Sequence, residues 1–175
     1  ASAVNLGAAA TVAGGAGNDT VQMTAAATLT DAGFLNASSV ETLRLTGAST
    51  ITLGTNAASA GIVNVITGNG ATSITNSNGV TLNVNAATLA NNTVLTLVGS
   101  SVEVVTGLIG NITASALTGA LTVTTGNATD NSIAIITGSA ATSITASGAS
   151  DVVTVTATAL AQNTALTLIG SAAET

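Results

Sequence analysis

The stretch with the clearest chemical potential is GGAGNDTV, residues 14–21. It fits the pattern G-G-x-G-x-D-x-U, in which U is a large apolar residue, at every specified position. Glycines permit a tight turn with inward backbone carbonyls, and the Asp19 carboxylate adds a hard oxygen ligand of the kind that Ca²⁺ prefers. The candidate calcium half-site consists of Gly14, Gly15, Gly17, Asn18 and Asp19.

A single copy of this motif does not complete a site, because the ion normally lies between turns supplied by successive copies. The alternative role of Asp19 is to cap its own turn. The related stretch ASGASDVVTV, residues 146–155, keeps Asp151 but lacks the glycine pair, which favours a turn cap there. Asp130, in the polar loop 127–131, is a weaker candidate oxygen ligand, and a surface turn is the default interpretation of that loop.

The chain repeats itself at a spacing of about 71 residues, and such self-similarity is the mark of repeat proteins, in which each unit buries its apolar face against its neighbours. The three best copies are 89–103 with 160–174, 66–75 with 136–145, and 45–54 with 117–126, which match at ten of fifteen, eight of ten and seven of ten positions. We therefore expect one continuous segment of a longer chain, with approximate units 1–32, 33–103 and 104–174.

Composition restricts both the core and the chemistry. Histidine, cysteine, tryptophan, tyrosine, lysine and proline are absent, Phe34 is the only aromatic residue, and Arg44 is the only basic one. Charged residues make up 5% of the chain, against about 25% in an ordinary domain. A core of small, largely β-branched side chains requires backbone layers that lie close together. A narrow coil of stacked strands meets that requirement.

Short segments with alternating apolar and polar residues predict strands, and most end at Gly or Asn, which suit tight corners. Their spacing predicts coils of roughly 18 to 22 residues, three or four to each repeat unit, and hence an all-β parallel solenoid. The stretches 25–29 and 157–161 are expected to be corners or weak strands. A β-sandwich is the alternative, although it needs no such repeat. The predicted strands are 50–53, 62–66, 81–85, 95–98, 121–124, 132–136 and 152–156.

The motif GGAGNDTV, followed by SSVETLRLTG at 38–47 and STITLG at 49–54, resembles the RTX-type secreted surface proteins of Gram-negative bacteria, above all their surface-layer and adhesin members. The resemblance covers about residues 10–54 and lacks the tandem calcium repeats of that family. It implies a right-handed parallel β-solenoid, type I export, and Ca²⁺-dependent folding or assembly. It also implies a secreted, cell-surface location and a structural role in an S-layer, matrix fibre or adhesin stalk.

Residue types argue against several functions. Without His, Cys, Lys or Tyr, the usual bases and nucleophiles reduce to Ser, Thr, Asp and Glu, so we expect no enzyme. One basic residue cannot neutralise a nucleic-acid backbone. No apolar run approaches the roughly 20 residues of a membrane helix. The expected partners are further copies of the chain in a lattice or fibre, and cell-surface polysaccharide is a second candidate.

Two further patterns leave alternatives open. Glu41, Glu103 and Glu174 could form a cation-binding ladder, but a solvated edge is favoured. The T-x-T triplets at 50–52, 122–124 and 154–156 are typical of flat ice-binding arrays. They are widely and unevenly spaced along the sequence, so no ladder on successive coils is expected from them. An ice-binding or carbohydrate-binding solenoid is the alternative to a structural scaffold.

Overall fold

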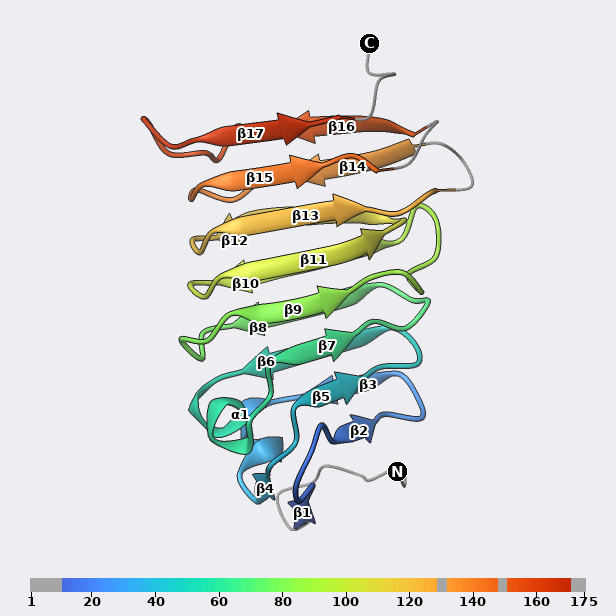
Figure 1. Ribbon diagram of the computed structural model, residues 1–175, viewed down its shortest axis with the longest axis vertical. Helices are drawn as coiled ribbons and strands as arrows, with labels where there is room; N and C mark the ends of the chain where they lie inside the picture. Colours follow the sequence, from blue (N-terminus) through green and yellow to red (C-terminus); the bar gives the residue numbers. More distant parts are fainter. Residues whose placement is uncertain (1–10, 129–131, 148–150, 171–175) are drawn as a thin grey trace.

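The computed structural model describes residues 11–128, 132–147 and 151–170. The chain winds upward as a stack of coils, each of which places one strand at the front and one at the back (Figure 1). Front strands run to the right and rear strands to the left as the chain climbs, so the solenoid is right-handed. Neighbouring strands of both sheets are parallel, which confirms the predicted all-β parallel solenoid.

Two sheets form the walls. The front sheet contains β2 (Thr20–Gln22), β5 (Thr42–Arg44), β7 (Asn64–Ile66), β9 (Leu82–Asn85), β11 (Glu103–Leu108), β13 (Leu121–Thr125), β15 (Thr142–Thr145) and β17 (Leu166–Ile169). The rear sheet contains β3 (Ala27–Leu29), β6 (Ser49–Leu53), β8 (Thr72–Asn76), β10 (Val94–Gly99), β12 (Asn111–Leu117), β14 (Ser132–Ile136) and β16 (Val152–Thr156).

Smaller elements lie at the N-terminal end of the stack. Strands β1 (Val12–Ala13) and β4 (Ala37–Ser38) pair with each other, and the 3-10 helix η1 (Asp31–Phe34) and helix α1 (Thr55–Ala60) fill the first two corners on one side (Figure 1). Within the two long sheets, paired residues on adjacent coils lie between 17 (Thr96 and Thr113) and 24 (Ser143 and Thr167) positions apart. The predicted coil length is therefore close to what is observed.

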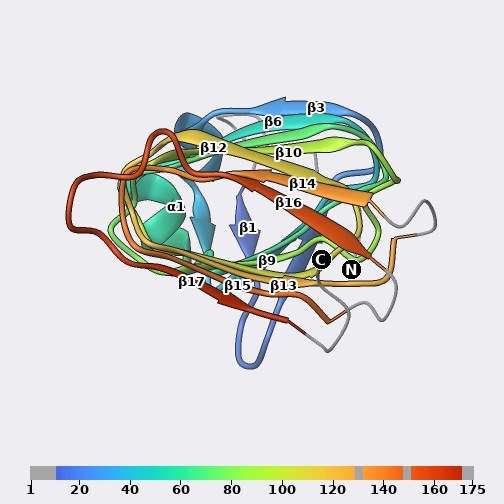
Figure 2. The ribbon, with the colours of Figure 1, turned by 90° about the horizontal axis from the view of Figure 1, so that it is seen from above.

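The core lies between the two sheets, as the view along the stack shows (Figure 2). Strand β6 illustrates how it forms, because its residues alternate between buried and exposed along the strand. Inward side chains are mainly Val, Leu, Ile and Ala, and Ile51 and Leu53 are fully buried. Phe34 also enters this core. Small side chains thus fill one continuous, thin core, as the composition predicts.

All the predicted strands are present, with only small shifts at their ends. The stretch 25–29 ends in strand β3, and 157–161 forms a corner, as expected. Helix α1 was not predicted. It is too short for propensity to decide its conformation, and its start depends on a residue from the preceding coil.

The sequence repeat corresponds to seven strands, or three and a half coils. The repeat relates three strands of the rear sheet to three strands of the front sheet. The equivalents of β6, β8 and β10 are β13, β15 and β17, in that order. Corners on opposite sides also match: Asn92 and Asn163 both have positive φ, of 58° and 63°. Each repeat therefore turns the pattern by half a turn about the solenoid axis, so that the two faces carry related surfaces.

Candidate functional site

The predicted calcium motif forms the turn between β1 and β2. Gly15 and Gly17 have φ of 99° and 108°, the left-handed region that glycine adopts without strain. A Cβ on Gly14 would lie 1.7 Å from the Ser39 carbonyl oxygen, so only glycine fits there. Asn18 is exposed. The glycines of the motif therefore serve a compact turn against the next coil.

Asp19 forms hydrogen bonds with Glu41 of the next coil. The Asp19 N–H donates to Glu41 Oε2 at 2.8 Å, and the Asp19 carbonyl oxygen accepts from the N–H groups of Glu41 (3.2 Å) and Thr42 (3.0 Å). Asp19 Oδ2 is buried and has no hydrogen-bond partner among the described residues. The sequence suggested Glu41 only as a member of a cation-binding ladder with Glu103 and Glu174, and not as a neighbour of Asp19, because that proximity depends on the coil register.

These two carboxylates fit part of a calcium site. They come from adjacent coils, as a site between successive turns requires, and Asp19 Oδ2 is a buried acceptor without a donor in the described part of the chain. Within the described ranges, however, no cluster of three or more Asp, Glu, His or Cys residues exists. A bound Ca²⁺ would therefore need backbone carbonyls or water for most of its oxygen ligands.

The Asp151 side chain forms a hydrogen bond with a neighbouring coil. Its side chain is 6% exposed, and Oδ2 accepts a hydrogen bond from the Ala128 N–H at 3.0 Å. The contact joins two coils and is not a cap of Asp151's own turn, so the local turn cap favoured by the sequence stays a prediction. Asp130, the other weak calcium candidate, and Glu174 lie outside the described residues.

Asp31 is a capping residue that sequence reasoning missed. Its Oδ1 accepts from the N–H groups of Gly54 (2.8 Å) and Ala57 (2.9 Å), and its Oδ2 accepts from Asn56 N–H (3.1 Å). These donors lie at the start of α1, one coil later. Burial raises the pKa of Asp31, but the hydrogen bonds outweigh it and hold the pKa below its ordinary value. No local signal marks this contact, because helix α1 is too short to be predicted from propensity and the coil lengths vary.

Glu103 corrects the expectation of a solvated edge, because its side chain is completely buried. Asn76 Nδ2 donates to Glu103 Oε1 at 2.9 Å, and Oε2 has no hydrogen-bond partner in the described part of the chain. Burial raises the pKa of Glu103 to about 8, although the hydrogen bond from Asn76 lowers it. At neutral pH this carboxyl is therefore mainly protonated, which avoids a buried charge. Glu41 is instead half-buried against Asp19.

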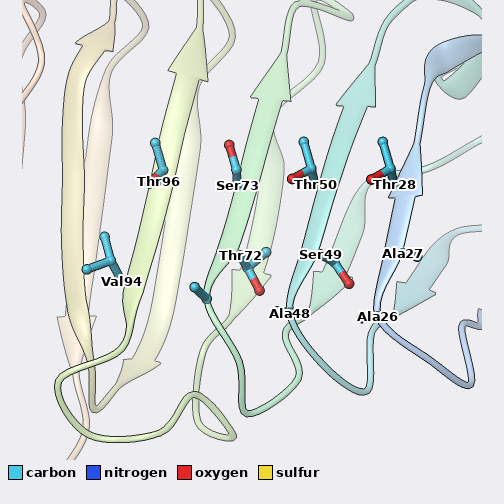
Figure 3. Close-up of a pocket in the computed structure, with 11 residues that line it drawn as sticks. Ala26, Ala27, Thr28, Ala48, Ser49, Thr50, Thr72, Ser73, Val94 and Thr96 are labelled. Carbon is cyan, nitrogen blue, oxygen red and sulfur yellow. The ribbon is translucent and has the colours of Figure 1, made fainter.

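The outer face of the rear sheet carries a hydroxyl ladder. Strand register aligns five outward residues on successive coils: Thr28, Thr50, Ser73, Thr96 and Thr113. Figure 3 shows the first four in a row, beside the file that begins with Ala26 and Ala48, and a shallow groove lies over both files.

The three T-x-T triplets form no ladder of their own, as expected, because they lie on separated coils. The ladder draws on residues outside the T-x-T triplets, and its members lie 17 to 23 positions apart. Of the triplets themselves, 50–52 and 154–156 lie in the rear sheet, whereas 122–124 lies in the front sheet. Unequal coil lengths hide the ladder from any search at a fixed spacing.

No protein-family model, curated protein or solved structure matches this chain. In the described ranges, no helix is long and apolar enough to cross a membrane.

Proposed function

We propose that this chain is a structural building block of a secreted bacterial surface assembly, such as a surface layer, matrix fibre or adhesin stalk. The observation that carries the proposal is the use of its acidic side chains. Asp31, Glu41 and Asp151 each accept backbone N–H groups from an adjacent coil, and Glu103 accepts from Asn76 in the core. These carboxylates tie coil to coil, which is the task of a scaffold.

Surface chemistry supports the same proposal. The formal net charge is −6 over 175 residues, and the sheet faces carry mostly Thr, Ser, Asn and small apolar residues. Such faces repel neighbouring molecules weakly. In the last described coil, Leu166 and Leu168 pair with core-facing residues yet are 37% and 55% exposed, so apolar surface is open there to another β-coil.

Sedimentation velocity over a concentration series tests this proposal. A building block is expected to form larger species as concentration rises, and added salt should strengthen association by screening the net negative charge. A single monomeric species up to the solubility limit, at low and high salt, would rule out the assembly role.

We further propose that Ca²⁺ stabilises the first two coils through Asp19 and Glu41. The support is the hydrogen bond from the Asp19 backbone N–H to the Glu41 carboxylate of the next coil, together with the buried Asp19 Oδ2, which has no partner among the described residues. When bound, the ion would supply positive charge between two acidic groups. Asp151 is not included in this proposal, because its Oδ2 already accepts from the Ala128 N–H and no second acidic side chain is placed beside it among the described residues, although its Oδ1 is buried without a partner there.

The hydroxyl ladder favours ice binding as a second candidate function. Five hydroxyls from Thr28 to Thr113 follow one another at the strand spacing of about 4.8 Å, a regular array that ordered water could match. A thermal-hysteresis assay separates the candidates, since a scaffold without this activity leaves the freezing point equal to the melting point.

A further inference from the structure

The hydroxyl surface of the rear sheet recurs on the opposite face of the molecule. On β6, β8 and β10, six of the outward residues form a rear patch of Thr50, Thr52, Ser73, Thr75, Thr96 and Val98. On β13, β15 and β17 the corresponding front patch consists of Thr122, Thr124, Ser143, Thr145, Thr167 and Ile169. In each patch the register places the six side chains in two parallel files of three.

The two patches agree more closely than the core beneath them. Of the seven outward positions on these strands, five are identical, and the other two pair Val94 with Ala165 and Val98 with Ile169. Of the eight inward positions on the same strands, four are identical, and the others include Ser49 with Leu121 and Asn76 with Ala146. Packing normally restricts core residues more than surface ones. The retained surface pattern therefore points to a contact made by both patches.

Both patches are flat and uncharged. They consist of short hydroxyl side chains with one apolar residue at the edge, and Arg44 lies on β5, outside either patch. Short side chains on parallel, regularly spaced strands can interdigitate with a like surface, as stacked β-sheets do. A surface of this kind is complementary to itself.

The arrangement of the patches selects the geometry of contact. They lie on opposite faces and are displaced along the solenoid axis by three and a half coils (Figures 1 and 2). If the rear patch of one molecule meets the front patch of another, the two stay parallel and are staggered by about 17 Å, since strands lie about 4.8 Å apart. Such a contact between two different patches does not close on itself, so it propagates as an open array.

Resting on the proposed assembly role, we propose that the rear and front patches bind one another between copies of this chain, producing a staggered layer. Each contact spans three strands and covers about 250 Å² per molecule, from the strand dimensions. This is below the roughly 800 Å² per partner of a stable pair. Association through one contact is therefore weak, and the array gains strength because each molecule makes two contacts.

A charge inserted at each patch centre tests this pairing in the full chain. Ser73→Lys blocks the rear patch and Ser143→Lys blocks the front patch, because each long charged side chain would have to be buried against a neutral face. Asn83→Lys, an exposed outward position on β9 outside both patches, is the matched control with the same change in charge. Melting temperatures establish that all three variants fold.

The pairing predicts a specific pattern in small-angle X-ray scattering over a concentration series. Ser73→Lys alone and Ser143→Lys alone stay monomeric, their equimolar mixture forms pairs but no larger species, and Asn83→Lys associates as the wild type does.

Dimers in either patch variant alone would overturn the pairing of unlike patches. Undiminished association in both variants would overturn the patches as the interface while leaving assembly intact. A wild type that never associates would overturn both, and thermal hysteresis lost in Ser73→Lys would then assign the rear patch to ice.

Discussion

Individual carboxyl groups in this chain act mainly between coils. Asp31, Glu41 and Asp151 each satisfy backbone N–H groups that the neighbouring corner leaves open. A lost buried hydrogen bond of this kind costs about 1–3 kcal/mol. Glu103 differs from them, because it lies in the core with one oxygen unpartnered among the described residues and a pKa raised to about 8.

Glu103 should make stability fall as pH rises. The pKa of this group is about 8 in the folded chain against 4.5 ordinarily, so between these values the folded state keeps a proton that the unfolded state has lost. Its contribution is complete below pH 4.5 and is lost as pH rises to about 8. Since each pKa unit corresponds to about 1.4 kcal/mol, the total loss amounts to a few kcal/mol. Urea denaturation at pH 5 and pH 9 measures it.

Glu103→Gln supplies the matched comparison, because the amide keeps the side-chain size and the acceptor for Asn76. The variant should lose most of the difference in unfolding free energy between pH 5 and pH 9. An equal difference in wild type and variant would show that other groups cause the pH dependence.

Calcium should raise the melting temperature if Asp19 and Glu41 hold the ion, because a ligand that binds only the folded state stabilises it by mass action. Asp19→Ala and Glu41→Gln should each remove much of that shift. Asp151→Asn, whose carboxylate binds the Ala128 N–H instead, should leave the shift unchanged. Identical melting of the wild type in Ca²⁺ and in chelator would exclude a functional site in the first two coils.

Sequence reasoning could find Asp19, because its motif is local, but it could not find the partners. Glu41, Asp31 and Glu103 act on residues 22 to 27 positions away. Coil lengths vary, so the register that aligns such residues emerges only when the whole stack is built. Glu103 was assigned to a solvated edge for the same reason, since nothing local shows that it points inward.

At the scale of a corner, glycine permits one coil to approach the next. A Cβ on Gly68 would lie 2.4 Å from the Thr46 carbonyl carbon, and a Cβ on its repeat equivalent Gly138 would lie 2.1 Å from the Leu117 carbonyl oxygen. These clashes involve backbone, which cannot move aside without opening the stack. The Thr-Gly corners thus have a steric cause.

Gly68→Ala and Gly138→Ala should each destabilise the fold by about 2–3 kcal/mol, as overpacking of a tight contact does. Gly47→Ala is the control, since it occupies the same kind of corner but its Cβ would lie 3.6 Å from the nearest atom, Ala26 N. Chemical denaturation of the three variants measures the difference. Equal stabilities for Gly47→Ala and Gly68→Ala would contradict the close approach.

Strands were more predictable than their connections. The alternation in 121–124 and 152–156 depends only on which side chains face the core, so periodicity locates those strands. Helix α1 depends on Asp31 from the coil below. Strand β11 places polar Glu103 in the core and contains Gly107 with φ of 66°, which obscures its alternation.

Over the whole molecule, the sequence repeat and the structural coil have different lengths. Seven strands per repeat is an odd number, so each repeat begins on the opposite sheet from the one before. An even number would have concentrated related surfaces on a single face. The half-turn distributes them to both faces, which suits a block that contacts neighbours on two sides.

X-ray diffraction from a concentrated, shear-aligned sample tests the central claim most directly, because it reports both the stacked strands and the order between molecules. The stacked strands should give a reflection at about 4.8 Å along the solenoid axis. A lateral stagger of about 17 Å, three and a half such spacings, should add lower-angle order. Scattering from independent monomers alone, at every concentration and with or without Ca²⁺, would contradict the claim that this solenoid is built to assemble.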